Sequence, residues 1–223
     1  DPRLLKGECR TLLKKRGDLR SERDVETLVA FVKRFRFFSE FSHDALRDIC
    51  RVAYYTECPA GETLFEQGSI ALSFHIVFEG SVWVQVRSHD PGGGTSTTNV
   101  ALLREGDAFG ELGLMSDGDH TRKAGVVARE DAGLLSLRKA EYRRLVGPFH
   151  EAQTRARVAF LRTLPLFAGG GFAWSEGQLT SLAKVMIERR LPVGACVFTQ
   201  GDVGNEVFFL CAGEADVIQQ VPE

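Results

Sequence analysis

Hydrophobic side chains near the start of the chain recur with the spacing of an amphipathic α-helix. Between residues 25 and 35 they return every three or four positions, which places them on one helix face. The five are Val25, Leu28, Val29, Val32 and Phe35. Ser21 precedes this run, and the carboxylate of Asp24 follows three residues later, so a capped helix start is expected there. A second helix is expected to begin at Ser42. Its buried side would carry Leu46, Ile49 and Cys50.

From Tyr54 the spacing of the hydrophobic positions changes to that of β-strands. Short runs rich in β-branched and aromatic residues alternate with glycine turns. The runs are 63–66, 74–78, 82–86, 100–103, 126–128 and 134–137. They predict an eight-stranded β-roll, similar to a jelly roll. The run 90–99, which contains three consecutive glycines, is expected to be a flexible hairpin tip.

Helical spacing returns after Arg138, so the predicted fold class is mainly β with flanking helices. One face of a long helix would carry Phe149, Ala152, Ala156, Ala159 and Phe160. Leu164-Pro165 and the glycines 169–171 are expected to break it. Residues 1–20 are expected to be basic and irregular, with a short helix around Leu12 and Leu13.

Two stretches of the chain resemble each other at a constant separation of 133 positions, for example 59 and 192. The pairs are Pro59 and Pro192, Gly61 and Gly194, Phe65 and Phe198, Gln67 and Gln200, Gly68 and Gly201, Gly80 and Gly213, Ser42 and Ser175, and Leu46 and Leu179. Such a repeat predicts a tandem protein. We expect a basic segment at 1–20, a complete domain at 21–162 and the first half of a second domain at 163–223, in a piece of a longer chain.

Composition excludes several classes of function. The net charge of −2 provides no general attraction to nucleic acid or to anionic membranes. No apolar run approaches the roughly 20 residues of a membrane span. The five cysteines and five histidines are scattered, so reduced thiols in the cytosol are expected, and no metal centre. No nucleophile has a recognisable partner, and a cupin-type enzyme would require a His/Glu metal cluster, so no enzyme is expected.

The segment 109–127 carries the candidate chemistry. Gly110 and Gly113 allow close backbone approach, and a helical turn beginning there would direct N–H groups toward an anion. Arg122, on the next strand, offers a two-donor fork that suits a phosphate. Glu111 beside it would repel an anion unless its carboxylate met a hydroxyl, for which a ribose 2′-OH is the natural partner. The sugar and base side would be lined by Leu112 and Val126.

This segment resembles the phosphate-binding cassette of cyclic nucleotide-binding domains, the regulatory modules of cAMP-dependent protein kinase, exchange factors, ion channels and bacterial regulators. The similarity rests on Phe109-Gly110-Glu111-Leu112-Gly113-Leu114 followed by Arg122-Lys123-Ala124, and on the turns Pro59-Ala60-Gly61-Glu62, Gln67-Gly68 and Phe78-Glu79-Gly80. It covers roughly residues 22–162, and again 163–223. The resemblance implies that Glu111 binds the ribose 2′-OH, and that Arg122 and nearby amides bind the cyclic phosphate. The expected binding residues are Gly110, Glu111, Leu112, Gly113, Arg122, Lys123, Ala124 and Val126.

The resemblance further implies a sensor that binds cAMP, cGMP or a related nucleoside and signals allosterically, as the tandem regulatory subunits of cAMP-dependent protein kinase do. A protein effector such as a kinase catalytic subunit is expected, in the cytoplasm or in a cilium or flagellum. No helix-turn-helix follows the barrel, so no nucleic-acid partner is expected. Three departures keep a degenerate, non-binding barrel with a structural or ciliary role open as the alternative: the long loop 115–121, Thr121 in place of proline, and Gly125 in place of Ala, Ser or Thr.

Three further features have weaker interpretations. Trp174 and Phe149 could stack on a base, although ordinary core packing suits such aromatic residues better. Residues 15–19, Lys-Arg-Gly-Asp-Leu, resemble the inhibitor segment of kinase regulatory subunits, but Asp18 stands where a small residue is expected. A solvated basic segment that ends a helix fits them better. His75 is expected to be a strand residue rather than a catalytic base.

Overall fold

The structure is a computed structural model that describes residues 2–89, 93–115, 120–168, 173–204 and 206–219. The chain forms two compact units, one from Asp1 to Glu151 and one from Ala152 to Glu223. The boundary between them falls within helix α5, Gly147–Thr163.

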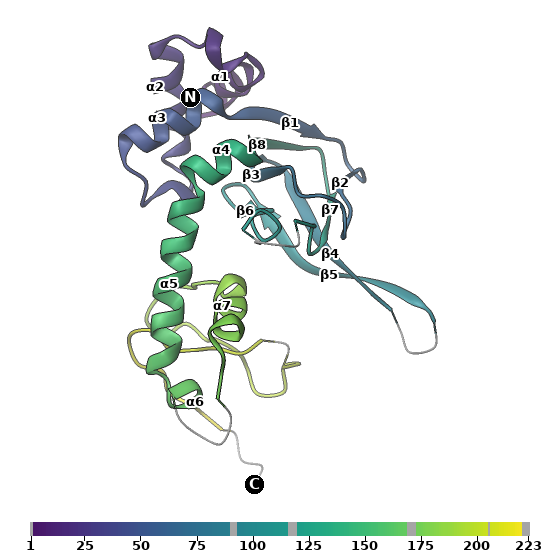
Figure 1. Cartoon of the computed structure of the whole chain (residues 1–223), viewed down its shortest axis with the longest axis vertical. Helices are drawn as coiled ribbons and strands as arrows, with labels where there is room; N and C mark the ends of the chain where they lie inside the picture. The colour runs from purple at the N-terminus through teal and green to yellow at the C-terminus, as the bar shows by residue number, and fades with distance from the viewer. Residues whose placement is uncertain (1, 90–92, 116–119, 169–172, 205, 220–223) are drawn as a thin grey trace. The chain divides into compact units, whose positions relative to one another are not determined.

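The first unit contains a β-roll of two antiparallel four-stranded sheets, ordered β1-β8-β3-β6 and β2-β7-β4-β5 (Figure 1). Its strands are β1 Tyr54–Cys58, β2 Thr63–Phe65, β3 Ser73–Glu79, β4 Ser81–His89, β5 Thr95–Arg104, β6 Ala108–Phe109, β7 Gly125–Ala128 and β8 Ala132–Arg138. The predicted mainly-β class and the eight strands are confirmed. Strands β1 and β6 were absent from the expected runs, because Tyr54–Cys58 is largely polar and Ala108–Phe109 is only two residues long.

The expected hairpin tip at 90–99 was wrong for its second half. Strand β5 begins at Thr95, and its pairing with β4 runs from Ser81 opposite Arg104 to His89 opposite Thr95. All side chains from Thr95 to Val100 are exposed, so this part of the strand has no hydrophobic alternation to reveal it. Residues 90–92 of the expected tip lie outside the described residues.

Helices flank the roll on both sides in sequence. They are α1 Pro2–Lys14, the 3-10 turn η1 Gly17–Leu19, α2 Glu22–Val32, the 3-10 turn η2 Arg36–Phe38, α3 His43–Val52, α4 Lys139–Leu145 and α5. Ser21 and Asp24 form the capping box of α2, and Ser42 caps α3 by accepting from the Ala45 N–H, as predicted. The buried faces predicted for α2 and α3 are also confirmed.

The expectation of an irregular N-terminal segment was wrong, because residues 2–14 form helix α1. Cys9 and Leu13 of α1 are fully buried, and tertiary contacts of this kind stabilise a helix that sequence propensity alone leaves marginal. The buried Arg20 closes the C-terminal end of α1: its guanidinium donates to the carbonyl oxygens of Leu12, Leu13 and Lys15. The same side chain donates to the Cys50 carbonyl oxygen of α3 at 2.6 Å, which joins the two helices.

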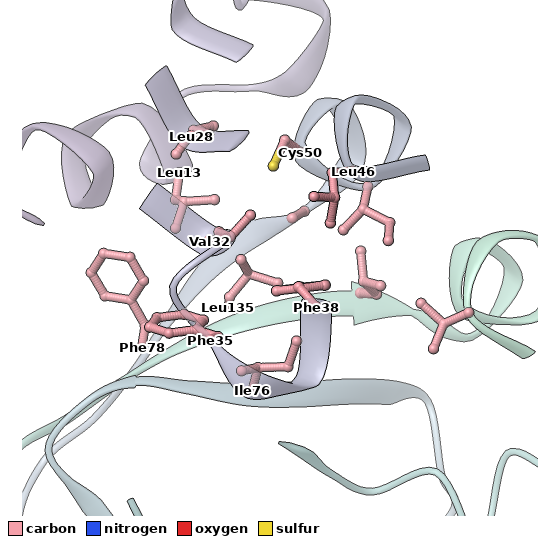
Figure 2. Packing of buried hydrophobic residues seen from close by; sticks show 14 of the residues in the cluster. Leu13, Leu28, Val32, Phe35, Phe38, Leu46, Cys50, Ile76, Phe78 and Leu135 are labelled. Carbon is pink, nitrogen blue, oxygen red and sulfur yellow. The ribbon is translucent and has the colours of Figure 1, made fainter. Parts of the chain in front are cut away.

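The main core of the first unit lies between these helices and the sheet that contains β3 and β8 (Figure 2). Phe31 of α2 packs on Phe78 of β3 with ring centres 5.1 Å apart. Ile76 of β3 and Leu135 of β8 face the same cluster and are fully buried. Because burying one such side chain contributes about 1.5–3 kcal/mol, this cluster fixes the sheet against the helices.

The second unit contains the end of α5, α6 Pro165–Ala168 and α7 Glu176–Val185. Ser175 and Gln178 form a capping box at the start of α7, as predicted. The break after α5 is confirmed, and the glycines 169–171 lie outside the described residues. The predicted buried face of α5 was wrong in this unit: Ala152, Ala156 and Ala159 are exposed. In this unit the buried positions of that helix are Thr154, Val158 and Leu161.

The second unit repeats local geometry of the first at the same separation of 133 positions. Helices α3 and α7 begin at His43 and Glu176 and end at Val52 and Val185. Three glycine pairs share the left-handed region: Gly61 (φ 78°) with Gly194 (φ 80°), Gly68 (φ 84°) with Gly201 (φ 96°), and Gly80 (φ 76°) with Gly213 (φ 90°). No strand occurs in the described residues beyond 185, and most apolar side chains there are exposed.

Candidate functional site

All eight predicted binding residues line one cavity of about 200 Å³ in the first unit. They are Gly110, Glu111, Leu112, Gly113, Arg122, Lys123, Ala124 and Val126. The sequence reasoning missed four further lining residues, contributed by β2, β4, β5 and β6: Phe65, Val84, Leu103 and Ala108. Phe109, which opens the predicted cassette, completes the lining. Strand alternation could have indicated the first three, because inward positions of a roll line any cavity that it encloses.

The cassette forms the predicted turn after β6. The N–H groups of Leu114 and Met115 donate to the Glu111 carbonyl oxygen at 2.8 and 2.9 Å, so one helical turn begins at Glu111. Gly110 has a φ of +91°, a conformation that favours glycine. A Cβ on Gly113 would lie 2.5 Å from the Thr121 carbonyl oxygen. Both glycines are therefore required by the path of the backbone.

Arg122 lies just ahead of β7 rather than in a strand. Its backbone is held by two hydrogen bonds: its N–H donates to Ser69 O at 2.7 Å, and its carbonyl oxygen accepts from the Gly68 N–H at 2.8 Å. Its side chain reaches back across the turn, where Nη1 donates to Gly110 O at 2.9 Å and Nη2 donates to Ser73 O at 2.8 Å. Only 4% of this arginine is exposed, so the cavity is built around a buried guanidinium.

The charge on Arg122 is retained in this position. Burial lowers the pKa of Arg122 to about 10, while the carboxylate of Glu111 acts in the opposite direction. The guanidinium carbon lies 3.8 Å from the centre of the Phe65 ring, within the range of a cation–π contact. Its Nε is buried and has no hydrogen-bond partner among the described residues. A buried donor of this kind is costly unless an acceptor meets it, and an oxygen-rich anion would supply one.

The departures from the family pattern affect the cavity unequally. Gly125 does not line it, and contributes instead to a smaller hollow of about 80 Å³ beside Gln67 and Gln85. The presence of glycine at position 125, in place of Ala, Ser or Thr, therefore leaves the lining of the main cavity unchanged. Thr121 makes an isolated β-bridge with Ile70, which fixes the segment that carries Arg122. Residues 116–119 of the long loop lie outside the described residues.

The other sequence candidates have structural roles. Phe149 packs on Phe41 with ring centres 4.5 Å apart, as the core-packing interpretation predicts. In the second unit, Trp174 makes an edge contact with Phe167 at 5.2 Å. The basic segment 15–19 follows α1 and is mostly exposed, which confirms that it ends a helix in solvent. His75 lies in β3 as predicted and is 3% exposed.

Within the described part of the chain, His, Cys, Asp and Glu residues do not form any group of three or more that could hold a metal ion. None of its helices combines the length and the apolar character that crossing a membrane requires.

Comparisons with known proteins agree with this site. Residues 55–147 match the family model of the cyclic nucleotide-binding domain. The chain is 28% identical over 182 residues to a cAMP-dependent protein kinase regulatory subunit of Blastocladiella emersonii. The aligned region covers 82% of this chain and 43% of the relative. It is 25% identical over 205 residues to the regulatory subunit of Yarrowia lipolytica, and this aligned region covers 90% of this chain and 49% of the relative. The chain thus spans about half the length of the curated relatives that it matches.

Solved structures show the same fold. The regulatory domain of Toxoplasma gondii PKA, crystallised with cAMP, gives a TM-score of 0.52 at 22% identity and covers 60% of this chain and 49% of its own. The regulatory subunit of a cAMP-independent protein kinase A from Trypanosoma brucei gives 0.51 at 23% identity, covering 64% and 48%. Residues 55–147, which comprise most of the β-roll together with α4, are thus similar to a cyclic nucleotide-binding domain, and the chain is similar to cAMP-dependent protein kinase regulatory subunits.

Proposed function

We propose that the first unit binds a cyclic nucleoside monophosphate in the cavity around Arg122. The observation that carries this proposal is a buried, charged guanidinium in a cavity lined by all eight predicted binding residues. Arginine binds phosphate through paired N–H donors, and a cation in a low-dielectric site attracts an anion strongly. A nucleoside without phosphate would bring no anion to this guanidinium, so retention of Arg122 favours the phosphate-bearing ligand.

Glu111 is the proposed partner of the ribose. Glu111 is partly buried and lines the same cavity as Arg122. The negative charge of its carboxylate raises the pKa of Arg122 against the effect of burial. A carboxylate accepts a hydrogen bond from a hydroxyl, and the ribose 2′-OH is the hydroxyl nearest the phosphate of a cyclic nucleotide. A ligand without this hydroxyl would lose that hydrogen bond to the carboxylate, so the site should discriminate against a 2′-deoxy ligand.

Occupancy of the cavity would reach the flanking helices through an aromatic cluster behind β3. Phe74, the neighbour of Ser73, packs on Tyr142 of α4 at 5.1 Å and on Phe37 of η2 at 5.4 Å between ring centres. The Tyr142 hydroxyl bonds to His150 Nδ1 of α5 at 2.8 Å. A shift of Ser73 that follows ligand binding to Arg122 would therefore move packed rings on α4 and at the start of α5, and allosteric transmission can use such contacts.

The wider role follows from the relatives, which are regulatory subunits. We propose a non-enzymatic sensor whose effector is a protein such as a kinase catalytic subunit, acting in the cytoplasm. We also propose that the chain comprises the basic segment 1–20, a binding domain at 21–162 and the first half of a second domain at 163–223. The paired helices α3 and α7 and the paired left-handed glycines support this division.

Calorimetric titration with cAMP, cGMP, 2′-deoxy-cAMP and adenosine tests the binding proposal. Replacing Arg122 by Gln should weaken cyclic nucleotide binding by about 100-fold, because charge-assisted hydrogen bonds are lost in a buried site. The matched control is Arg129→Gln, since Arg129 contacts Trp83 at 5.9 Å outside the cavity. Adenosine binding as tightly as cAMP would contradict the phosphate role. A folded protein that binds none of the four would favour the scaffold alternative.

A further inference from the structure

A continuous line of buried and partly buried polar side chains crosses the sheet β1-β8-β3 behind the cavity. His75 of β3 bonds through Nδ1 to Ser136 Oγ of β8 at 2.8 Å and through Nε2 to Ser73 Oγ at 2.8 Å. Ser136, which is fully buried, bonds in turn to Thr56 Oγ1 of β1 at 2.8 Å. Polar side chains inside a core are costly unless every group is paired, and here both ring nitrogens of His75 are.

The line ends at the ligand cavity. Ser73 accepts from Arg122 Nη2 twice, on its carbonyl oxygen at 2.8 Å and on its hydroxyl at 3.3 Å. Ser73 is thus the residue through which the buried polar line meets the guanidinium. The rings around it are stacked in the same region: His75 lies 5.4 Å from Phe109 and 6.0 Å from Phe65 between ring centres, and Phe65 also contacts Arg122.

Arg122 fixes one direction in this line, because a guanidinium only donates and the Ser73 oxygen therefore accepts from it. The hydroxyl proton of Ser73 can then be donated to His75 Nε2, which lies 2.8 Å away, and we adopt this direction. Nδ1 then carries the ring proton and donates to Ser136 Oγ, and the Ser136 hydroxyl donates to Thr56. In this arrangement the imidazole is neutral, with its proton on Nδ1.

The surroundings of the ring agree with a neutral imidazole. Burial, and next the charge of Arg122, lower the pKa of His75 to about 3. A second cation at this position would remove the acceptor from the Ser73 proton and repel the guanidinium. A phenylalanine would fill the same stacked position. The histidine differs from it in that its ring nitrogen bonds the Ser73 hydroxyl.

We propose that His75 is a positioning residue for Arg122: through the Ser73 hydroxyl it holds the guanidinium at the angle that the ligand cavity requires. This inference rests on the proposed function, since it deepens the role of Arg122 in that cavity. It assigns to β3 and β8 a part in ligand binding that their distance from the cassette in the sequence does not suggest. His75 need not touch the ligand in this arrangement.

The first test is a double-mutant cycle on cAMP affinity. His75→Phe keeps the ring and Ser73→Ala keeps the backbone acceptor, so each should raise the dissociation constant about three- to tenfold. Because His75 acts through the Ser73 hydroxyl, the double variant should lose no more than the weaker-binding single variant. The control Thr56→Val cuts the far end of the line and should leave affinity unchanged. Wild-type affinity in His75→Phe, or losses that multiply in the double variant, would overturn the inference.

The second test needs no ligand, so it separates this inference from the binding proposal. Nitrogen-15 NMR of the imidazole in the ligand-free chain at pH 7 should show a neutral ring protonated at Nδ1. In Ser73→Ala that tautomer preference should weaken, because Nε2 loses its donor. A doubly protonated ring, or a proton on Nε2 in the wild-type chain, would contradict the positioning role even if cAMP binds. If the chain shows the predicted tautomer but binds no cAMP, only the binding proposal is refuted.

Discussion

The guanidinium carbon of Arg122 lies 3.8 Å from the centre of the Phe65 ring, so the candidate phosphate-binding cation rests on an aromatic surface contributed by β2. This contact orients the arginine from one side while the carbonyl oxygens of Gly110 and Ser73 hold its Nη atoms. The cavity therefore presents a guanidinium that is already ordered before a ligand arrives. Preorganisation of this kind raises affinity because little conformational freedom remains to be lost on binding.

Phe65→Leu should weaken cyclic nucleotide binding about 2- to 30-fold, because a cation–π contact at a buried site contributes about 0.5–2 kcal/mol. The matched control is Trp83→Leu, which removes an aromatic partner of Arg129 at 5.9 Å outside the cavity. Calorimetry with cAMP compares the two. Equal affinities in both variants would show that Phe65 serves packing alone.

Gly113→Ala should destabilise the first unit by about 1–3 kcal/mol and weaken binding, because its Cβ would lie 2.5 Å from the Thr121 carbonyl oxygen and 2.8 Å from Ala71 Cβ. Gly7→Ala is the contrasting change within α1, where a Cβ meets nothing within 4 Å. It should stabilise the helix by about 0.5–1 kcal/mol. Urea unfolding measures both variants, and shifts in the same direction would contradict the predicted close approach of the two loop segments.

His75 predicts a specific loss of stability in mild acid. Its pKa is about 3 in the folded chain and about 6.5 when exposed, so the unfolded state binds more protons between these values. Stability is then complete above pH 6.5 and decreases as the pH falls. Between pH 7.5 and 5.5 this group alone should lower the free energy of unfolding by about 1.4 kcal/mol. Urea titrations at both pH values should show that increment in the wild type and not in His75→Phe. If the free energy of unfolding depended on pH in the same way in the wild type and in His75→Phe, the prediction would be refuted.

Arg20→Lys should lower the free energy of unfolding by about 3 kcal/mol, because the single ammonium cannot replace four hydrogen bonds to carbonyl oxygens at the ends of α1 and α3. Circular dichroism during urea unfolding gives the value. The exposed Arg23→Lys on the next helix is the control and should change little. Equal midpoints for the two variants would show that Arg20 is not the residue that fixes α1.

Much of the fold could be predicted because periodic burial and capping are local properties of the chain. Ser21, Ser42 and Ser175 each indicated a helix start that the structure confirms. The cassette was also recognisable locally, since its glycines and its arginine are close in sequence. The structure brings all eight predicted residues to one cavity.

What could not be predicted depends on contacts between distant segments. Helix α1 forms because Cys9 and Leu13 are buried against later elements and Arg20 bonds its last carbonyl groups, none of which appears in local spacing. Phe65 reaches the cavity only through the pairing of β2 with β7. His75 looked like an ordinary strand residue because its partner Ser136 lies 61 positions later.

Amide hydrogen exchange should distinguish the two units sharply. Strands β3 and β8 pair from Ser73 opposite Arg138 to Glu79 opposite Gly133 with one irregularity after Val77, and most of their side chains are buried, so their amides should exchange slowly. In the described residues beyond 185 no strand is formed, and Val193, Val207 and Val217 are more than three-quarters exposed. Amides there should exchange orders of magnitude faster, because few buried contacts oppose local opening. If the amides of the described residues beyond 185 were as protected as those of β3, this part of the repeat would form stable hydrogen-bonded structure on its own, and the prediction would be wrong.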